Sequence, residues 1–329
     1  MEEYTEDNMN DHSDVLLSIC IPTYKRPDTI RQLMKSILSQ DADPKCYEIR
    51  ITDNSETDET KDVIEEYSGI ENLYYKKTDC KGFYNSWEAL KSGKGSLLKL
   101  HNDYSIFKPG TLQKMIDAVR REEHDKAQIF FSLGSLEGTP QRSEFSDYNS
   151  FMDCITIQAT WSSAFAIWKE DFDSITEKGI VPDTMYPHTS FLHRVTEKKR
   201  YVVDNYPYVQ NIEPKKKGGY NLIDNFVRIY LTMVKNELSG PEMITQETYR
   251  KIEKDILAFC ADWYYTTKEN PDKYTFKFDN AEEIIKSVCG ENAIKEYRSC
   301  LRKRKIKHYK MNIKKTIMRN VSHIGENGQ

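Results

Sequence analysis

The first 105 residues alternate between short apolar runs and amphipathic segments, and this alternation constrains the fold more than any other feature. Strand-like runs occur at 15–24, 47–55, 73–77 and 96–103. Segments with helical spacing of apolar residues lie between them, at 27–40, 58–69 and 82–95. The first run is apolar without alternation, which is typical of a strand covered on both faces, as in a parallel sheet. The order β-α-β-α-β-α-β therefore predicts a doubly wound α/β domain.

Beyond residue 128 the pattern changes to strand-like runs separated by polar loops, which favours mixed pairing with an antiparallel edge. These runs are 129–134, 152–157, 162–168 and 200–212. Residues 181–195 contain two prolines and are expected to form a loop that leads into a helix. From Leu222 onward, helices are predicted at 222–238, 246–268, 280–288 and 292–319.

The composition is that of an ordinary globular protein, with 38% apolar and 30% charged residues, and it excludes collagen-like, mucin-like and fully disordered chains. No stretch approaches about 18 consecutive apolar residues, so no bilayer-spanning helix is expected. Residues 1–14 carry six carboxylates and no Lys or Arg, unlike a secretory signal, which favours a cytoplasmic location. The seven cysteines are scattered without a C-x-x-C spacing, so we expect free thiols.

Polar residues follow each of the first four predicted strands, and they are the first candidates for a binding site. The four groups are Thr23 to Arg26, Asp53 to Ser55, Asp79 to Asn85, and His101 to Asp103. In open α/β sheets, ligands sit beyond the carboxyl ends of the strands. These groups are therefore expected to meet at one ligand-binding edge.

Taken together, four segments resemble the N-terminal half of a family-2 glycosyltransferase. They are SICIPTYKRPDTIRQLMKSIL, ITDNSETDET, KGFYNSWEAL and LLKLHND, in this order and spacing. The resemblance covers about residues 15–175, and within the family it is nearest to the abequosyltransferase-like branch of bacterial surface-polysaccharide enzymes. It implies the nucleotide-sugar transferase fold known as GT-A, a mixed and mostly parallel sheet between helices, with a C-terminal helical extension.

The resemblance assigns nucleotide binding to residues that follow the first three strands. At the end of the first strand, the residues that would pack on the nucleotide are Pro22, Thr23, Tyr24 and Arg26. Asp53 would accept hydrogen bonds from the base or ribose, since ring N–H and hydroxyl groups are donors. Gly82 and Asn85 would let the backbone approach the donor closely. On local grounds alone, Asp53 and its two neighbours also suit a helix N-cap cluster.

The fourth strand ends where the family carries an Asp-x-Asp motif that holds Mn²⁺ or Mg²⁺ against the donor pyrophosphate. This chain has His101, Asn102 and Asp103 there, so only the second carboxylate is kept. The resemblance makes Asp103 the direct metal ligand and places Asn102 on the ribose or on metal-bound water. His101 is a further candidate ligand that would favour Mn²⁺. A polar strand end without a metal is the alternative.

An inverting transferase needs a base near the acceptor hydroxyl, which loses its proton as the new bond forms. The family commonly uses an Asp of a Glu-Asp pair, downstream of the segment that residues 161–172 resemble. Glu170 and Asp171 come too early for that pair and fit a solvated helix start. Asp183 is therefore the expected base. His188 is expected to be an acceptor contact, a metal ligand or an alternative base, and a structural role for it stays open.

Two basic segments stand out against the net charge of −4. Residues 215–220 combine three lysines with two glycines, which suits either a loop that closes over the donor diphosphate or a solvated surface loop. Residues 301–320 carry nine Lys or Arg and no Asp or Glu. The helical spacing there predicts a cationic amphipathic helix that lies on an anionic membrane surface, or a helix packed on the body or on another subunit. The acidic remainder argues against nucleic acid as a partner.

These features predict an inverting, metal-dependent glycosyltransferase, cytoplasmic or peripheral on the inner face of the plasma membrane. The expected donor is a nucleotide-diphosphate sugar, first of all a UDP-sugar. The expected acceptor is a hydroxyl of a capsule, O-antigen or teichoic-acid type glycan, free or lipid-linked. The expected parts are a disordered acidic leader (1–14), a GT-A catalytic domain (15–221), a helical accessory region (222–300) and the basic tail (301–329).

Two alternatives differ in chemistry. A sugar nucleotidyltransferase is expected to carry a glycine-rich phosphate loop after the first strand, and the segment PTYKRPDT has no glycine. A degenerate, non-catalytic transferase fold could instead act as a scaffold at a membrane.

Overall fold

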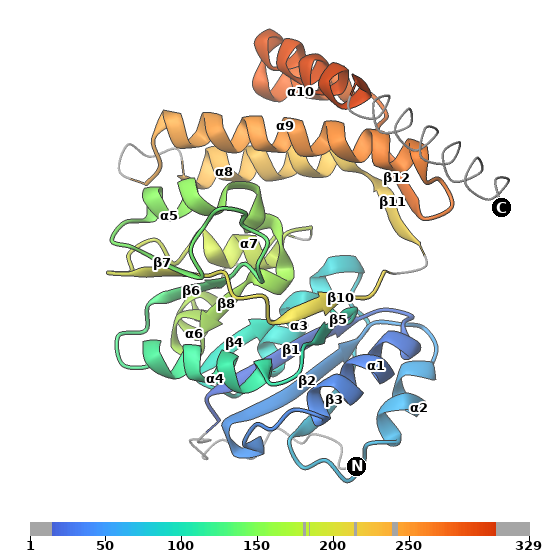
Figure 1. Ribbon diagram of the computed structural model, residues 1–329, viewed down its shortest axis with the longest axis vertical. Helices are drawn as coiled ribbons and strands as arrows, with labels where there is room; N and C mark the ends of the chain where they lie inside the picture. The colour runs from blue at the N-terminus through green and yellow to red at the C-terminus, as the bar shows by residue number, and fades with distance from the viewer. Residues whose placement is uncertain (1–14, 180–181, 184, 214–215, 239–242, 307–329) are drawn as a thin grey trace, which may run out of the picture. The chain divides into compact units, whose positions relative to one another are not determined.

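The computed structural model describes residues 15–179, 182–183, 185–213, 216–238 and 243–306 (Figure 1). The chain divides into two compact units. Unit 1 comprises Met1–Glu213 and Glu237–Thr248, and unit 2 comprises Pro214–Asn236 and Tyr249–Gln329. The predicted leader, and the basic tail beyond residue 306, lie outside the described residues.

A five-stranded sheet forms the centre of unit 1, in the order β3-β2-β1-β4-β8. Its strands are β1 (Leu17–Thr23), β2 (Tyr47–Asp53), β3 (Leu73–Lys77), β4 (Leu97–Leu100) and β8 (Ala166–Trp168). The first four run parallel, and β8 pairs antiparallel with β4. Strands β2 and β4 are buried along their whole length and β1 nearly so, as expected of a sheet covered on both faces. The predicted α/β fold with a mostly parallel sheet is confirmed.

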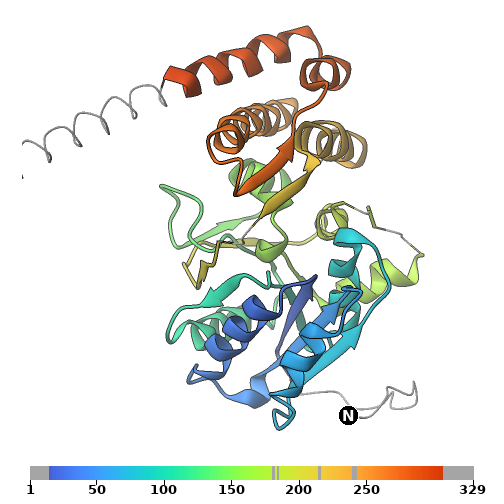
Figure 2. The ribbon, with the colours of Figure 1, turned by 90° about the vertical axis from the view of Figure 1, so that its right-hand side faces the viewer.

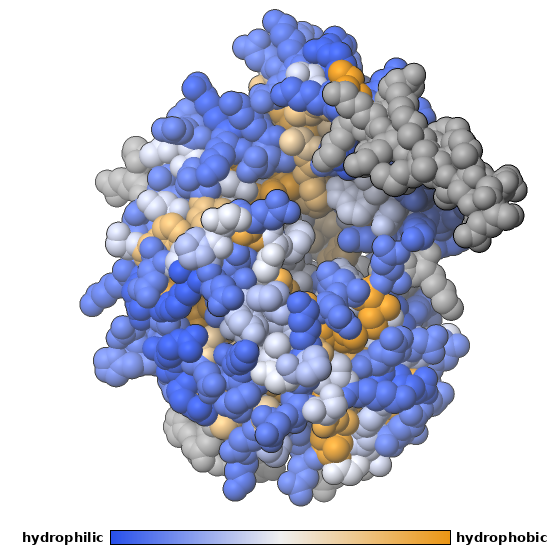
Figure 3. Space-filling view, viewed as in Figure 1, coloured by the Kyte–Doolittle hydropathy of each residue, from blue (hydrophilic) through white to orange (hydrophobic). Residues whose placement is uncertain are grey.

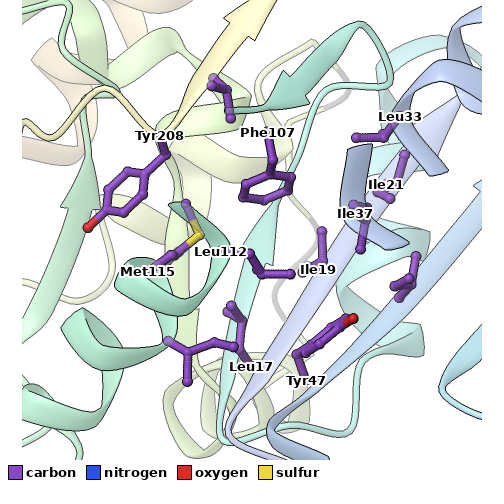
Figure 4. Packing of buried hydrophobic residues seen from close by; sticks show 14 of the residues in the cluster. Leu17, Ile19, Ile21, Leu33, Ile37, Tyr47, Phe107, Leu112, Met115 and Tyr208 are labelled. Atoms are coloured by element: carbon purple, nitrogen blue, oxygen red, sulfur yellow. The ribbon is translucent and has the colours of Figure 1, made fainter. Parts of the chain in front are cut away.

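The helices that connect these strands cover the sheet. They are α1 (Pro27–Leu38), α2 (Glu59–Glu65), α3 (Asn85–Ser92, preceded by the 3₁₀ turn η2, Gly82–Tyr84) and α4 (Thr111–Glu122). Pro27 occupies the first turn of α1, where its missing N–H costs nothing. Figure 4 shows Leu33 and Ile37 of this helix beside Ile19 and Ile21 of β1. Burial of each such side chain stabilises the fold by roughly 1.5–3 kcal/mol, so this layer fixes the strand ends that carry the site.

A second, three-stranded sheet in unit 1 has the order β6-β9-β7. Its strands are β6 (Gln128–Phe131), β9 (Tyr201–Asp204) and β7 (Arg142–Phe145), and a separate pair joins β5 (Ser105–Phe107) to β10 (Val209–Asn211). The helices of this part are α5 (Tyr148–Ile155), α6 (Lys169–Glu177) and α7 (Pro187–Leu192). Two 3₁₀ turns, η3 (Thr156–Thr160) and η4 (Ser162–Ala164), lead into β8.

The strand predicted at 152–157 is wrong, because residues up to Ile155 form α5. Asp147 caps this helix by accepting a hydrogen bond from the N–H of Ser150 at 2.8 Å. Tyr148, Phe151, Met152 and Ile155 are buried at helical spacing. The short apolar run alone is typical of a strand. The capping Asp147 and the buried Tyr148 and Phe151 upstream of it favour a helix instead.

Unit 2 consists mainly of helices, as expected from Leu222 onward. They are η5 (Asp224–Tyr230, a π-helix), α8 (Leu231–Leu238, whose last two residues belong to unit 1), α9 (Gln246–Glu269, of unit 2 from Tyr249) and α10 (Ala281–Cys289), and residues 291–306 are also helical. Figures 1 and 2 show α8 and α9 side by side. The rings of Phe226 and Phe259 join η5 to α9 with centroids 4.7 Å apart.

The basic segment 215–220 is not a loop throughout, because Lys217–Asn221 form β11, which pairs parallel with β12 (Tyr274–Lys277). Gly218 has φ +130°, and a Cβ there would lie 2.6 Å from the backbone nitrogen of Phe276. Glycine is therefore needed at position 218 because the two strands approach closely there, and not because the chain hinges at that point.

Among the described residues, no helix is long and apolar enough to cross a membrane. In Figure 3 hydrophilic side chains cover most of the face that is drawn, with small apolar patches between them. All seven cysteines carry free thiols.

Candidate functional site

The carboxyl ends of β1, β2 and β4 meet at one edge of the main sheet. Thr23 lies opposite Asp53 in the register of β1 and β2, and Leu100 lies opposite Cys20 in the register of β1 and β4. Because β8 runs antiparallel to β4, the turn η4 before it reaches the same edge. The structure thus gathers the predicted residues of the first, second and fourth strand ends, all within unit 1.

Asp103 lies nearly buried at this edge, and both of its carboxylate oxygens have partners. Thr23 Oγ1 donates to Oδ2 at 2.8 Å, and Arg26 Nη1 donates to Oδ1 at 2.8 Å. Burial raises the pKa of the Asp103 carboxyl, while Arg26 and Thr23 act in the opposite direction. The Arg26 guanidinium also lies over the Tyr104 ring, 5.3 Å from its centroid. The Arg26 side chain is 36% exposed, against 3% for Asp103, so a cation anchored on a buried carboxylate reaches solvent.

Asp53 is fully buried and saturated by its own surroundings. Its Oδ1 accepts from the Ser55 N–H at 2.9 Å and from the Ser55 hydroxyl, and its Oδ2 accepts from the Tyr75 hydroxyl at 3.0 Å. The Lys77 ammonium lies 3.8 Å from Oδ2. In this structure Asp53 therefore ties β2 to β3 and to the following turn, and both of its oxygens are hydrogen-bonded within the fold.

Asn85 acts in the same structural way. Its amide nitrogen donates to the carbonyl oxygens of Thr23 at 3.2 Å and Thr52 at 2.9 Å, and its Oδ1 accepts from the Thr78 hydroxyl at 3.1 Å. The side chain is buried. It thus joins the ends of three neighbouring strands, and both its amide nitrogen and its Oδ1 are hydrogen-bonded within the fold.

The remaining predicted donor contacts are more open. Gly82 has φ +57°, and a Cβ at this position would meet nothing within 4 Å, so its conformation, not crowding, calls for glycine. Tyr24 follows β1 with 47% of its surface exposed, and its hydroxyl donates to Glu56 Oε1 at 3.1 Å. Pro22 belongs to β1 and is partly buried opposite Thr52.

His101 is buried at the end of β4. Its Nε2 lies 2.6 Å from the Ser105 carbonyl oxygen, and its ring stacks on Phe107 with centroids 4.8 Å apart. Burial lowers the pKa of His101 to about 3. The ring is therefore neutral at ordinary pH, with its Nε2 proton donated to Ser105.

Asn102 bridges two other groups. Its Oδ1 accepts from the Ser162 hydroxyl at 2.8 Å, and its Nδ2 donates to the Tyr104 hydroxyl at 2.9 Å. It thereby fixes η4 against the end of β4.

These residues do not fit a divalent cation in the arrangement that the structure shows. Asp103 supplies the single carboxylate of the motif and already bonds Arg26 through one oxygen and Thr23 through the other. The Nε2 of His101 is bonded to a backbone carbonyl. Within the ranges that the structure describes, no group of three or more His, Cys, Asp or Glu side chains is placed to hold a metal ion. We therefore derive no step through a metal.

Asp183 lies on the segment that leads into α7 and His188 in the first turn of that helix, and neither belongs to the Asp103 cluster. Oδ1 of Asp183 accepts from the N–H groups of Met185 at 2.7 Å and Tyr186 at 2.8 Å, which shapes the turn before the helix. His188 is buried with Nε2 3.0 Å from the Thr160 carbonyl oxygen, and burial lowers its pKa to about 4. Its neutral ring packs α7 on η3, which favours the structural role.

Sequence reasoning missed Lys99, which is fully buried in β4. Its ammonium donates to the carbonyl oxygens of Leu100 at 2.9 Å and Ser163 at 2.5 Å, and burial lowers its pKa to about 7. Lys99 therefore holds η4 against β4, beside the Ser162 contact to Asn102. A lysine inside the apolar run SLLKL was the signal in the sequence.

Comparison with known proteins places this architecture in a class. The fold is that of the GT-A nucleotide-sugar transferases. Residues 18–175, which include the β1, β2 and β4 ends, match the family model described as Glycosyl transferase family 2. The matched segment is just under half of the chain and lies within unit 1.

Solved structures that share the fold include two bound to a nucleotide sugar. TarS 1–349 of S. aureus, in complex with UDP-GlcNAc, is 16% identical with a TM-score of 0.56, and the match covers 88% of this chain and 91% of that one. Mannosyltransferase PcManGT from Pyrobaculum calidifontis, in complex with GDP-Man and Mn²⁺, is 12% identical with a TM-score of 0.52, covering 87% and 82%. Of a longer TarS chain, 53% is covered. At such identities the likeness shows the fold alone.

A curated relative is the O-antigen biosynthesis protein RfbC of Myxococcus xanthus. It is 29% identical over 111 residues, which are 32% of this chain and only 8% of that protein. The chain thus spans a small part of that relative's length. The abequosyltransferase-like branch inferred from sequence is not confirmed by these matches.

Proposed function

We propose that this chain is an inverting glycosyltransferase that moves a sugar from a nucleotide-diphosphate donor to a hydroxyl of a bacterial surface glycan. The observation that carries the proposal is the cluster of Thr23, Arg26 and Asp103, at the carboxyl ends of β1 and β4, inside the segment that matches family 2. Ligands of such sheets bind at this edge. An accessible cation there suits an anionic donor.

For the donor we propose a UDP-sugar, which agrees with the UDP-GlcNAc bound in the TarS structure. The exposed ring of Tyr24 follows β1 directly and offers a face on which a flat base can stack. A capsule, O-antigen or teichoic-acid type acceptor agrees with the role of RfbC as an O-antigen biosynthesis protein.

For the acceptor side we propose Asp183 as the base. Its Oδ1 is engaged by the turn, and among the described residues its Oδ2 has no hydrogen-bond partner. Helix α7, which follows it, packs against α3, whose first residue is Asn85. The Asp183 carboxylate would take the proton of the acceptor hydroxyl while the hydroxyl oxygen attacks the anomeric carbon and the bond to the diphosphate breaks.

Trp161 is a candidate platform for the acceptor. Its side chain is 39% exposed, and it immediately precedes Ser162, which bonds Asn102 beside Asp103. An exposed indole face at this place suits the apolar face of a sugar ring. We further propose that the basic segment 301–320 binds an anionic membrane surface, although its part beyond residue 306 lies outside the described residues.

The test is a donor screen with the full chain. UDP-, GDP-, CDP- and dTDP-sugars are incubated with a lipid-linked glycan extract, with and without Mn²⁺, and released nucleoside diphosphate and product anomer are followed. We expect one donor class to react, faster with acceptor, with inversion. Asp183→Asn should abolish turnover, whereas Glu170→Gln, an exposed acid on α6, should not. Failure of every donor to bind or react would favour the scaffold, and pyrophosphate release from a nucleoside triphosphate and a sugar phosphate would favour the nucleotidyltransferase.

A further inference from the structure

We propose that Arg26 binds the diphosphate of the donor, held in place by Asp103, and that this guanidinium supplies the positive charge for which the fold commonly uses a divalent cation. The inference rests on the proposed function. It follows from the mismatch between the donor set at the end of β4 and the needs of a metal ion.

Asp103 is committed to orienting Arg26. Its two oxygens bond Arg26 Nη1 and Thr23 Oγ1, both at 2.8 Å, and the carboxylate is 3% exposed. A metal ion bound by the same oxygens would lie close to the Arg26 guanidinium, and the repulsion between the two cations would disfavour it. Charge-assisted bonds of this kind are among the strongest in proteins, so the pair favours a fixed cation over an exchangeable one.

Arg26 has donors to spare. A guanidinium carries several N–H groups in a planar fork, and among the described residues only Nη1 is engaged, by Asp103. The face of the group is supported by the Tyr104 ring at 5.3 Å, and 36% of the side chain is exposed. The remaining N–H groups thus suit a ligand with paired oxygens, such as a phosphate.

The backbone around Arg26 supports an anion as well. Lys25 adopts φ +52°, an uncommon conformation for a lysine, and its N–H donates to the Ser55 hydroxyl at 2.7 Å. This turn sets Arg26 at the N-cap of α1, and the N–H groups of Asp28 and Thr29, the first after Pro27, receive no side-chain cap. The positive end of the helix dipole therefore adds to the charge of the guanidinium.

In the transfer step, the acceptor oxygen forms its bond to the anomeric carbon. The electron pair of the broken bond goes to the diphosphate oxygen, and the acceptor proton goes to the base. Arg26 exchanges no proton. Its N–H groups donate to the diphosphate oxygens, where negative charge grows, and a donor that is already oriented is most effective there.

The experiment measures UDP binding to the full chain by calorimetry in EDTA and in Mn²⁺. We expect UDP to bind in EDTA, and Arg26→Gln to weaken that binding by ~10- to 100-fold. Arg26→Lys should recover part of the affinity, because an ammonium keeps the charge but not the fork. Arg31→Gln is the matched control on α1, where Arg31 pairs with Glu66, and its UDP affinity should not change.

Arg26→Gln leaves a buried carboxylate unpaired, so the double variant Arg26→Gln with Asp103→Asn is measured beside it. It removes both charges and is expected to fold while binding UDP as weakly as the single variant. The inference is overturned if UDP binds only with Mn²⁺, or if either Arg26→Gln variant folds and binds UDP as the unmodified chain does. Those results would leave the proposed transferase intact. Absence of both UDP binding and donor turnover, with and without Mn²⁺, would instead defeat the proposed function.

Discussion

Two buried aspartates lie at the same edge of one sheet and serve different ends. Asp53, after β2, is fully enclosed and hydrogen-bonded by Ser55 and Tyr75, while the Lys77 ammonium stays 3.8 Å away and bonds Asp58 instead. Asp103, after β4, is bonded by Thr23 and by an arginine that reaches solvent. The first carboxylate completes the local hydrogen bonding of the fold, whereas the second orients a charge toward the outside. The two aspartates therefore differ in role because their hydrogen-bond partners differ.

The largest expected effect is a loss of stability in the enclosed cluster around Asp53, to which Asn85 belongs. Asn85→Ala removes the donor for two buried carbonyl oxygens and the acceptor for Thr78, which should lower the free energy of unfolding by about 3 kcal/mol. Asn54→Ala, at a partly exposed amide that donates to the carbonyl oxygens of Cys80 and Gly82 and accepts one bond from Asn85, should cost about 1 kcal/mol. Denaturant unfolding measures both. If both variants lost the same free energy of unfolding, the burial of Asn85 would not contribute more to stability than the exposed amide of Asn54 does.

Substitutions in the solvent-reaching cluster of Asp103 and Arg26 should lower activity more than stability. Asp103→Asn releases Arg26 from its anchor, so we expect kcat to fall by ~10- to 100-fold while UDP affinity stays within about threefold. The free energy of unfolding should fall by about 1 kcal/mol, less than for Asn85→Ala, because asparagine keeps the size of the side chain and one acceptor oxygen, and the Arg26 end of the ion pair is 36% exposed. Steady-state kinetics and unfolding on the same preparation decide. A stability loss as large as that of Asn85→Ala would mean that both clusters are structural.

Lys99 is buried in β4 and bonds the turn η4 near Asn102. Its titration can be followed through the pH dependence of stability. Its pKa of about 7 lies below the ordinary value of 10.5. Between these values the unfolded chain binds more protons, so stability rises with pH, by up to about 1.4 kcal/mol per pH unit. Below pH 7 both states are protonated and this dependence vanishes. Unfolding of the unmodified chain minus that of Lys99→Met, from pH 7 to 9, should show the slope. A pH-independent difference would contradict a depressed pKa.

The smallest effect concerns the acceptor. Trp161→Ala removes a ring that is 39% exposed, so we expect the KM for acceptor to rise by ~3- to 10-fold, at unchanged UDP affinity. Phe83→Ala, at another exposed ring beside the third strand end, is the control and should leave the acceptor KM alone. If both variants act alike, Trp161 has no selective role.

Much of this architecture could be predicted from the sequence, because its pattern is local. The unbroken apolar run of β1 and the helical spacing of Ile30, Leu33 and Ile37 record burial directly in the residue types. The same patterns locate the strand ends, and they bring Thr23, Arg26 and Asp103 among the candidates.

Which of the predicted site residues are enclosed by the fold and which reach solvent could not be predicted, because this depends on partners that are distant in the chain. Asp53 is enclosed by Tyr75, 22 residues away, and Asp103 is paired with Arg26, 77 residues away. A histidine beside an aspartate is the pattern of a metal ligand, yet Ser105 and Phe107 enclose the ring of His101. Only the fold reveals such enclosure.

The most direct measurement is a crystal structure of the chain with UDP, grown once in EDTA and once in Mn²⁺. In both, the diphosphate oxygens should lie within hydrogen-bond distance of the Arg26 guanidinium, with Asp103 still bonded to Arg26 and Thr23. A manganese ion seated between Asp103 and the diphosphate, with Arg26 turned away, would contradict the account, as would UDP bound away from the ends of β1 and β4.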